Sequence, residues 1–160
     1  MIKKNQSLIK LIAVLGLTFG ASAVGSVATM PAITTWYAAL ARPSIAPPNW
    51  LFGPVWTLLF LLMAIAAWRI WRLGLKKAGV RRALGWYWAQ LILNVCWSLV
   101  FFGAHSPYWA LYVIIALWLA IFAAIFHFSR LDKTAAWLLA PYLLWVSFAS
   151  ILNYAFWMLN

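Results

Sequence analysis

Few side chains in this sequence could carry acid–base or metal chemistry. Asp132 is the single carboxylate among 160 residues, and the two histidines are His105 and His127. Acid–base catalysis by paired carboxylates is therefore excluded, as is a carboxylate-lined path for cations or protons through a membrane. The histidines fall at opposite ends of the expected helices and cannot share one metal. A single haem ligand is conceivable, although a lone histidine near a membrane surface is more commonly a contact with lipid headgroups.

Nucleophilic and phosphate-binding motifs are also missing from the sequence. Cys96 is the only cysteine, so neither a disulfide within the chain nor a cysteine metal site can form. The sequence contains no Gly-rich phosphate loop, no nucleophile elbow and no Cys/His pair. We therefore expect no metal, no required cofactor and no ordinary hydrolytic or redox catalysis.

The chemical resource of the chain is aromatic surface, with 13 Trp, 6 Tyr and 10 Phe residues. Those near expected helix ends suit the membrane interface, where amphipathic rings lie at the level of the headgroups. We assign to this interfacial belt Trp36, Tyr37, Trp68, Trp71, Trp86, Tyr108 and Trp109. Other aromatic residues lie deeper in the apolar segments and accompany polar residues.

Two stripes combine these deeper aromatic residues with small or polar ones. Gln90, Asn94 and Trp97 are four and three residues apart, which puts them on one face of a helix. The second stripe consists of Trp145, Ala149 and Leu152. A buried amide in lipid needs a partner, and hydrogen bonds between helices, worth about 0.6 to 2 kcal/mol each, would supply one. The alternative is a pocket with tryptophan walls and a few orienting polar groups, suited to a planar aromatic or rigid polycyclic ligand.

The elements that would position these residues are membrane-spanning helices. The chain is 68% hydrophobic and 8% charged, with a mean hydropathy of +0.94. Stretches of about 20 apolar residues are long enough to cross a bilayer. The sequence therefore predicts an all-α membrane protein, a bundle of five transmembrane helices in a single domain over 1–160. The expected helices cover 8–29, 50–73, 83–103, 108–128 and 135–158.

The first apolar segment has two interpretations. Lysines followed by an apolar stretch and by "ASA" at 21–23 are compatible with a cleaved signal peptide. The stretch continues past this site to Thr29, however, and carries small residues such as Gly16 and Gly20 at four-residue spacing. Small residues so spaced let helices approach closely in lipid, which favours a retained helix.

The basic residues are sorted by loop. Counted alternately along the expected helices, eleven of the 12 Lys and Arg residues fall on one side, and Arg42 alone on the other. The eleven are Lys3, Lys4, Lys10, Arg69, Arg72, Lys76, Lys77, Arg81, Arg82, Arg130 and Lys133. The positive-inside rule then places the N-terminus in the cytoplasm and the C-terminus outside. Contact with anionic lipid headgroups accounts for the net charge of +11, so no nucleic-acid partner is expected.

Residues 41–49 contain three of the seven prolines, and Pro54 follows shortly after. Proline stiffens extended backbone and disfavours helix at the preceding residue, so a rigid non-helical loop is expected on the outer face. Such backbone is tolerated near a membrane where protein buries it or where it borders a cavity. The loop is then either a lid over the bundle or a simple connector.

Three segments of the chain resemble the TspO/MBR family of tryptophan-rich sensory proteins and translocator proteins. They are "WYAALARPSIAPPNWLFGPVWTLLF" at 36–60, "QLILNVCWSLVFF" at 90–102 and "PYLLWVSFASILNYAFWMLN" at 141–160. The resemblance extends over nearly the whole chain. It implies a five-helix bundle, commonly a homodimer, that binds porphyrins such as protoporphyrin IX. In various members of the family it also implies binding of sterols and of synthetic benzodiazepine-type ligands.

The resemblance also implies the ligand-binding positions. By motif they are Trp56, Asn94, Trp97, Phe101, Trp145, Ala149 and Leu152, with Pro47 and Trp50 in the lid. In some bacterial relatives the tryptophans matching Trp56 and Trp145 are associated with light- and oxygen-dependent breakdown of bound porphyrin, which makes these two the candidate catalytic residues.

Two departures from the family pattern concern ligand choice. The sterol-recognition pattern begins at Leu152 and Tyr154 but lacks the basic residue that should follow, so high-affinity cholesterol binding is not expected. Phe60 stands where many relatives have tyrosine, which removes a hydroxyl near the pocket.

The expected function is that of a membrane porphyrin-binding protein that senses, buffers or moves tetrapyrroles. One alternative is a metal-free, light-dependent porphyrin-degrading enzyme. A second is a sterol or lipid transporter, although no inverted repeat is evident. The expected location is a bacterial cytoplasmic membrane. Stripes of small residues at Gly16 and Gly20 and at Ala116, Ala120 and Ala124 offer two possible packing faces, and the resemblance favours a homodimer.

Overall fold

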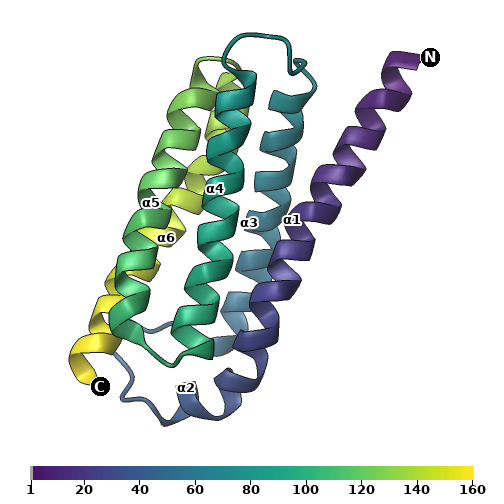
Figure 1. The fold of residues 1–160 in the computed structure, drawn as a ribbon. Coiled ribbons are helices and arrows are strands. Elements are labelled where there is room, and N and C mark those ends of the chain that lie inside the picture. The colour runs from purple at the N-terminus through teal and green to yellow at the C-terminus, as the bar shows by residue number, and fades with distance from the viewer. Residues whose placement is uncertain (1) are drawn as a thin grey trace.

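The computed structural model describes residues 2–160, with side chains from Asn5 onward. Lys3 and Lys4, which contribute to the predicted charge bias, lie outside the described side chains. The described residues form helices, and no strand occurs among them (Figure 1). In chain order they are α1 (Ile2–Thr34), α2 (Trp36–Ala39), α3 (Asn49–Trp71), α4 (Val80–Ser98), the π-helix η1 (Leu99–Gly103), α5 (Pro107–Ser129) and α6 (Lys133–Leu159).

The predicted all-helical, five-span architecture is confirmed. Within the described chain, five helices are long and apolar enough to cross a membrane: α1, α3, α4 with η1, α5 and α6. They lie side by side as a bundle, with α1 along one flank and its N-terminal part leading away from the other helices (Figure 1). The π-helix η1 continues α4 directly, so the two form one span.

The helix ends differ in detail from the predicted segments. α1 continues to Thr34, through Pro31, and a further short helix, α2, follows it. Residues 40–48 are non-helical, as the prolines predict, and a turn hydrogen bond there runs from the Ala46 amide to the Pro43 carbonyl. Nothing in the spacing of the sequence had indicated α2.

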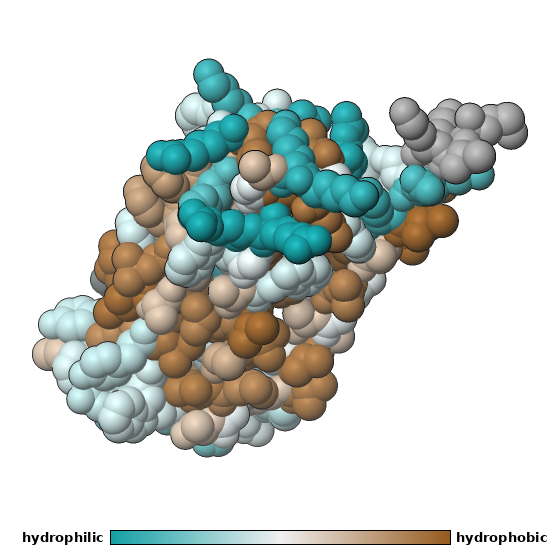
Figure 2. Space-filling model, turned by 45° about the horizontal axis from the view of Figure 1, so that its top comes forward, coloured by the Kyte–Doolittle hydropathy of each residue, from teal (hydrophilic) through white to brown (hydrophobic). Residues whose placement is uncertain are grey.

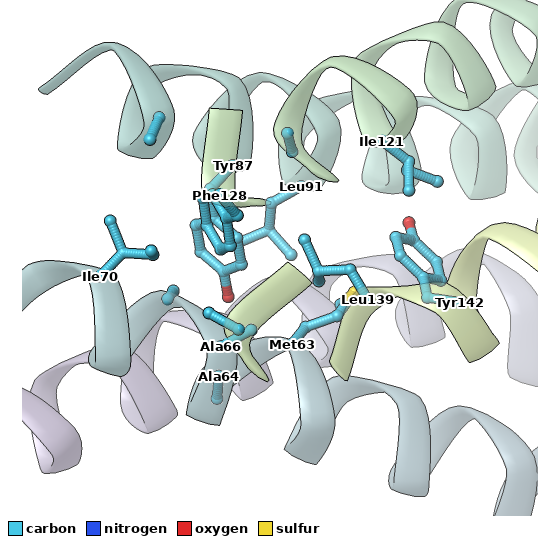
Figure 3. Packing of buried hydrophobic residues seen from close by; sticks show 14 of the residues in the cluster. Met63, Ala64, Ala66, Ile70, Tyr87, Leu91, Ile121, Phe128, Leu139 and Tyr142 are labelled. Carbon is cyan, nitrogen blue, oxygen red and sulfur yellow. The ribbon is translucent and has the colours of Figure 1, made fainter. Parts of the chain in front are cut away.

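A cluster of buried side chains joins α3, α4, α5 and α6 (Figure 3). Met63 and Ile70 of α3 meet Tyr87 of α4, Phe128 of α5 and Tyr142 of α6, and all five side chains are fully buried. Alanines of α3 fill the positions between them and let the helices approach closely: Ala64, Ala66 and Ala67. This half of the bundle is therefore solid, and the open space lies in the other half.

The two ends of the bundle carry different charge. Basic side chains gather over the α3–α4 and α5–α6 connections, where Figure 2 shows a hydrophilic end above apolar flanks. α1 reaches this end through Lys10, whose Nζ donates to the Trp71 carbonyl at 3.4 Å. Arg42 lies in the loop at the opposite end, near the last residue of α6. The segregation predicted from the sequence is thus present, while its orientation relative to the cytoplasm stays a prediction.

Asp132 connects α3 and α6 at the basic end of the bundle. Its carboxylate accepts from Arg69 Nε at 2.9 Å and Nη2 at 3.1 Å, and also from the Ala135 amide at 3.1 Å, which caps α6. Burial by itself would raise the pKa of the Asp132 carboxyl, but the Ala135 amide and the Arg69 guanidinium outweigh it and hold this pKa below its ordinary value. The sole carboxylate therefore has a structural role.

Candidate ligand-binding cavity

A cavity of about 290 Å³ lies in the half of the bundle next to α2 and the 40–48 loop. Its walls come from α1, α2, α3, α4, η1 and α6. The volume is at the lower end of the range of roughly 300–1,000 Å³ that is usual for small-ligand sites. The lining is mostly apolar and aromatic, with a few amides and hydroxyls.

The structure brings together seven of the nine residues singled out from the sequence. The cavity lining includes Trp56, Asn94, Trp97, Phe101, Trp145, Ala149 and Leu152. Their function in binding stays a prediction. The other two, Pro47 and Trp50, do not line the cavity: Trp50 is 72% exposed, and the Pro47 carbonyl accepts from Arg42 Nη2 at 2.9 Å. Both lie in or beside the loop, outside the walls.

The lining on α4 and η1 depends on a change of helical pitch. Asn94 and Trp97 follow from α-helical spacing, whereas Phe101 and Phe102 belong to the π-helix. The Ala104 amide donates to the Leu99 carbonyl at 2.8 Å, a five-residue step that widens the turn. As a result two consecutive phenylalanines both pack against Tyr37, with ring centroids 6.4 and 5.8 Å away.

The polar groups of the lining are largely used between helices. Asn94 Nδ2 donates to the Tyr142 hydroxyl at 3.1 Å, and Trp97 Nε1 donates to Asn153 Oδ1 at 3.0 Å. Asn153 Nδ2 in turn donates to the Pro107 carbonyl at 2.7 Å. The two interpretations left open by the sequence, helix–helix hydrogen bonds and a pocket, are therefore both realised by the same side chains.

One donor at the cavity is free. Trp145 Nε1 is buried and has no hydrogen-bond partner among the described residues. An indole N–H can only donate, so this group stays unpaired within the protein wall and not on the surface of the cavity.

The aromatic walls pack edge to face or offset, as ring quadrupoles favour. Trp97 stacks on Phe101 with centroids 5.3 Å apart, and Trp56 lies 5.6 Å from Phe60. The Trp145 ring meets Phe52 of α3 at 5.9 Å. Phe60, the residue that replaces a tyrosine of the family pattern, is buried and adds only apolar surface here.

Tyr37 corrects a prediction made from the sequence. We had assigned it to the interfacial belt, but it is 5% exposed and lines the cavity from α2. Burial raises the pKa of the Tyr37 phenol, and the positive charge of Arg42 opposes that shift in part. The reason for the error is α2 itself, which turns the chain inward after α1. Position relative to an apolar segment could not reveal this turn.

We define the cap as α2 with the 40–48 loop; of its residues Tyr37 lines the cavity, and the loop lies outside the lining. Asn160 clasps the backbone of Ala41: the Ala41 amide donates to Asn160 Oδ1 at 2.9 Å, and Asn160 Nδ2 donates to the Ala41 carbonyl at 3.2 Å. Trp36 stacks on His105 with centroids 4.7 Å apart. His105 therefore contacts the cap from outside the cavity, and it does not line it as a haem ligand would.

The residues of the incomplete sterol pattern do not share a face. Leu152 lines the cavity, whereas Tyr154 is exposed and packs on Trp157 with centroids 5.7 Å apart. Metal chemistry gains no support either, because no three His, Cys, Asp or Glu side chains gather anywhere in the described part of the chain. The arrangement suits non-covalent binding of a flat, mostly apolar molecule.

Sequence comparisons agree on one family. The model of the TspO/MBR family matches residues 12–158. The tryptophan-rich protein TspO of Chlorobaculum tepidum is 40% identical over 156 residues, which cover 98% of this chain and 99% of that protein. The tryptophan-rich sensory protein of Cereibacter sphaeroides is 40% identical over 147 residues, 90% of each chain. The human translocator protein is 41% identical over 125 residues, 76% of this chain and 73% of its own.

Proposed function

Because the chain belongs to the TspO/MBR family and is a multi-pass integral membrane protein, we propose that its cavity binds tetrapyrroles such as protoporphyrin IX. In this proposal the protein senses, buffers or moves the tetrapyrrole. The observation that carries it is the aromatic-walled cavity, into which seven positions of the family motifs converge. A tetrapyrrole is flat, largely apolar and acidic only at its propionates, which matches apolar walls with few polar groups.

The chain offers a distinct partner for each part of such a ligand. The faces of Trp56, Trp97 and Trp145 would stack on the macrocycle. Arg42 would meet a propionate at the cap, because a guanidinium has five N–H donors and, among the described residues, the Pro47 carbonyl engages one of them.

The same apolar cavity would accept benzodiazepine-type ligands, which are also rigid and polycyclic. Sterol binding has weaker support, since Leu152 and Tyr154 face different surroundings. We further propose that the protein forms a homodimer. A bacterial cytoplasmic membrane is the proposed location, in line with the bacterial origin of two of the relatives.

The first prediction concerns the two cavity tryptophans. Protoporphyrin IX is titrated into the purified protein in lipid nanodiscs. Binding is followed in the dark by the quenching of tryptophan fluorescence. Trp56→Phe and Trp145→Phe each remove part of a stacking surface, worth about 0.5–1.5 kcal/mol, so the Kd should rise about twofold to tenfold. Trp137→Phe is the matched control, because Trp137 is 76% exposed on the other end of α6 and does not line the cavity.

The outcomes separate the possibilities. Unchanged Kd values in both cavity variants, or an equal change in Trp137→Phe, would contradict the assignment of the site. Quenching that does not saturate would mean that the porphyrin only partitions into the lipid.

Illumination of the same samples tests the enzymatic alternative. Loss of the porphyrin absorption band that needs folded protein, oxygen and both cavity tryptophans would establish degradation. Equal loss without protein would dismiss it.

A further inference from the structure

One wall of the cavity is not buried. Among the residues that line it, the exposed ones are Ser26 and Met30 of α1 and Asn49, Gly53 and Thr57 of α3. The lining residues from α4, η1 and α6 are buried or half-buried. The opening therefore faces sideways between α1 and α3, two helices that cross the membrane next to each other (Figure 1).

We call this opening the α1–α3 slot. A contact between the two helices closes it at one edge. Phe19 of α1 meets Phe60 of α3 with ring centroids 6.2 Å apart, at the level where the solid half of the bundle begins. Beyond it α1 is held to α4 instead of α3: a Cβ on Gly25 would lie 3.2 Å from Ser98 Oγ. Since α1 leans on α4 there, the gap toward α3 stays open.

The slot carries hydroxyls, although lipid should surround it. Three of them donate within their own helix at 2.9 Å: Ser26 Oγ to the Ser22 carbonyl, Thr29 Oγ1 to the Gly25 carbonyl and Thr57 Oγ1 to the Gly53 carbonyl. Such back-bonded hydroxyls avoid the cost of an unpaired polar group in hydrocarbon. A hydroxyl rotor can turn toward a passing polar atom, so the slot tolerates both lipid and a partly polar ligand.

The cap is the other possible entrance to the cavity, and hydrogen bonds hold it in place. Asn160 clasps the Ala41 backbone with two hydrogen bonds, and Arg42 holds the Pro47 carbonyl across the loop. Tyr37 anchors α2 beneath it, with its ring 5.1 Å from Phe156. Opening at this end would break these contacts, whereas the slot is open in the structure as it stands.

We propose that the ligand reaches the cavity from the bilayer, through the α1–α3 slot, and not through the cap. The proposal rests on the proposed function, because it names the route by which an apolar planar ligand arrives. Such a ligand concentrates in the apolar part of the bilayer, and the slot lies between two helices long and apolar enough to span it.

The test compares rates in nanodiscs. Ser26→Phe and Thr57→Phe narrow the slot without adding an indole that would disturb the fluorescence signal. Both the association and dissociation rates of protoporphyrin IX should fall by about fivefold or more, because a constriction slows passage in both directions. A lost contact would instead raise the dissociation rate alone. Val27→Phe is the matched control, since Val27 is 77% exposed on the same helix and does not line the cavity.

Asn160→Ala tests the competing route by loosening the cap. Wild-type rates in this variant support the slot. Faster association and dissociation in Asn160→Ala, together with unchanged rates in the two slot variants, would overturn it. If the unmodified protein shows no saturable binding, the proposed function fails as well, which distinguishes that outcome from failure of the route alone.

A chemical readout covers the case in which a phenylalanine variant does not fold. A lipid-soluble diazirine probe, photolysed in nanodiscs, forms a carbene that inserts without needing an ionised group. It should label Thr57, and saturating protoporphyrin IX should suppress that labelling, whereas Val27 should be labelled equally with and without the porphyrin. Protection at neither position, or equal protection at both, would contradict an occupied slot.

Discussion

Two buried amides in the bundle have opposite hydrogen-bonding situations. Asn153 accepts from Trp97 and donates to the Pro107 carbonyl, so both ends of its amide are used. Gln90 is 1% exposed, and neither its Oε1 nor its Nε2 has a partner among the described residues. An unpaired buried polar group costs about 1–3 kcal/mol, whereas a paired one stabilises modestly. The same residue class thus stabilises at one position and destabilises at the other.

Substitutions at these two residues should change stability in opposite directions. Gln90→Met keeps the length of the side chain and removes the unpaired amide, so the free energy of unfolding should rise by about 1–2 kcal/mol. Asn153→Leu leaves the Trp97 indole without its acceptor and should lower the free energy of unfolding by about 1–3 kcal/mol. Thermal unfolding in detergent, compared with the unmodified protein, measures both. A lower midpoint in Gln90→Met would show that a buried water or a ligand satisfies this amide.

At the scale of the elements, helix ends explain how the spans are joined. The π-helix η1 ends α4 and aims two phenylalanines inward, and Ser106 caps α5 by accepting from the Trp109 amide at 3.4 Å. Asp132 begins α6 and at the same time binds Arg69 of α3. A carboxylate at a helix N-terminus also meets the positive end of the helix dipole. This residue is therefore the most sensitive helix end in the described chain.

Asp132→Ala should lower the free energy of unfolding by about 1–2 kcal/mol, mostly through the lost cap. Asp132→Asn retains an acceptor for the Ala135 amide but loses the charge paired with Arg69. It should cost less, because a partly exposed ion pair contributes only about 0–1 kcal/mol. Equal losses in the two variants would show that the charge, and not the cap, is the main contribution.

The pH dependence provides a second check on Asp132. Its pKa is lowered in the folded state, so the stabilisation is fully present above the ordinary aspartate pKa of about 3.9 and is lost as the pH falls through the folded value. Thermal midpoints should therefore decline below about pH 4 in the unmodified protein and decline less in Asp132→Asn. A decline of the same size in both would assign the acid sensitivity to another cause.

At the scale of the whole molecule, charge and cavity lie at opposite ends. The basic side chains crowd over the α3–α4 and α5–α6 connections (Figure 2), while the cavity lies next to the cap, where Arg42 is the one basic side chain described. If the positive-inside rule holds, the cap faces away from the cytoplasm. Orientation then decides from which leaflet the α1–α3 slot is supplied.

Single cysteines measure that orientation in intact cells of a bacterial host. In a Cys96→Ser background, Ser44→Cys in the cap should react with a membrane-impermeant maleimide added outside. Lys77→Cys, exposed at the basic end, should react only after the membrane is permeabilised. The reverse pattern would overturn the predicted topology.

The sequence alone determined the class of the protein and most of its cavity residues. Apolar segments of the right length predicted five spans, prolines predicted the non-helical loop, and the resemblance to the TspO/MBR family implied seven residues that line the cavity, among them Asn94 and Trp145. The spans and the loop are local properties of the chain, because span length and turn chemistry depend only on neighbouring residues.

Only the tertiary structure decided which faces meet. Spans that are apolar all round show no moment that marks their inner side, and lipid gives no hydrophobic force to orient them. The burial of Tyr37, the pairing of Trp97 with Asn153 and the clasp of Asn160 on Ala41 all join residues distant in sequence. The slot between α1 and α3 has the same origin, since it exists because α1 packs on α4 at Gly25 and leaves α3 uncovered.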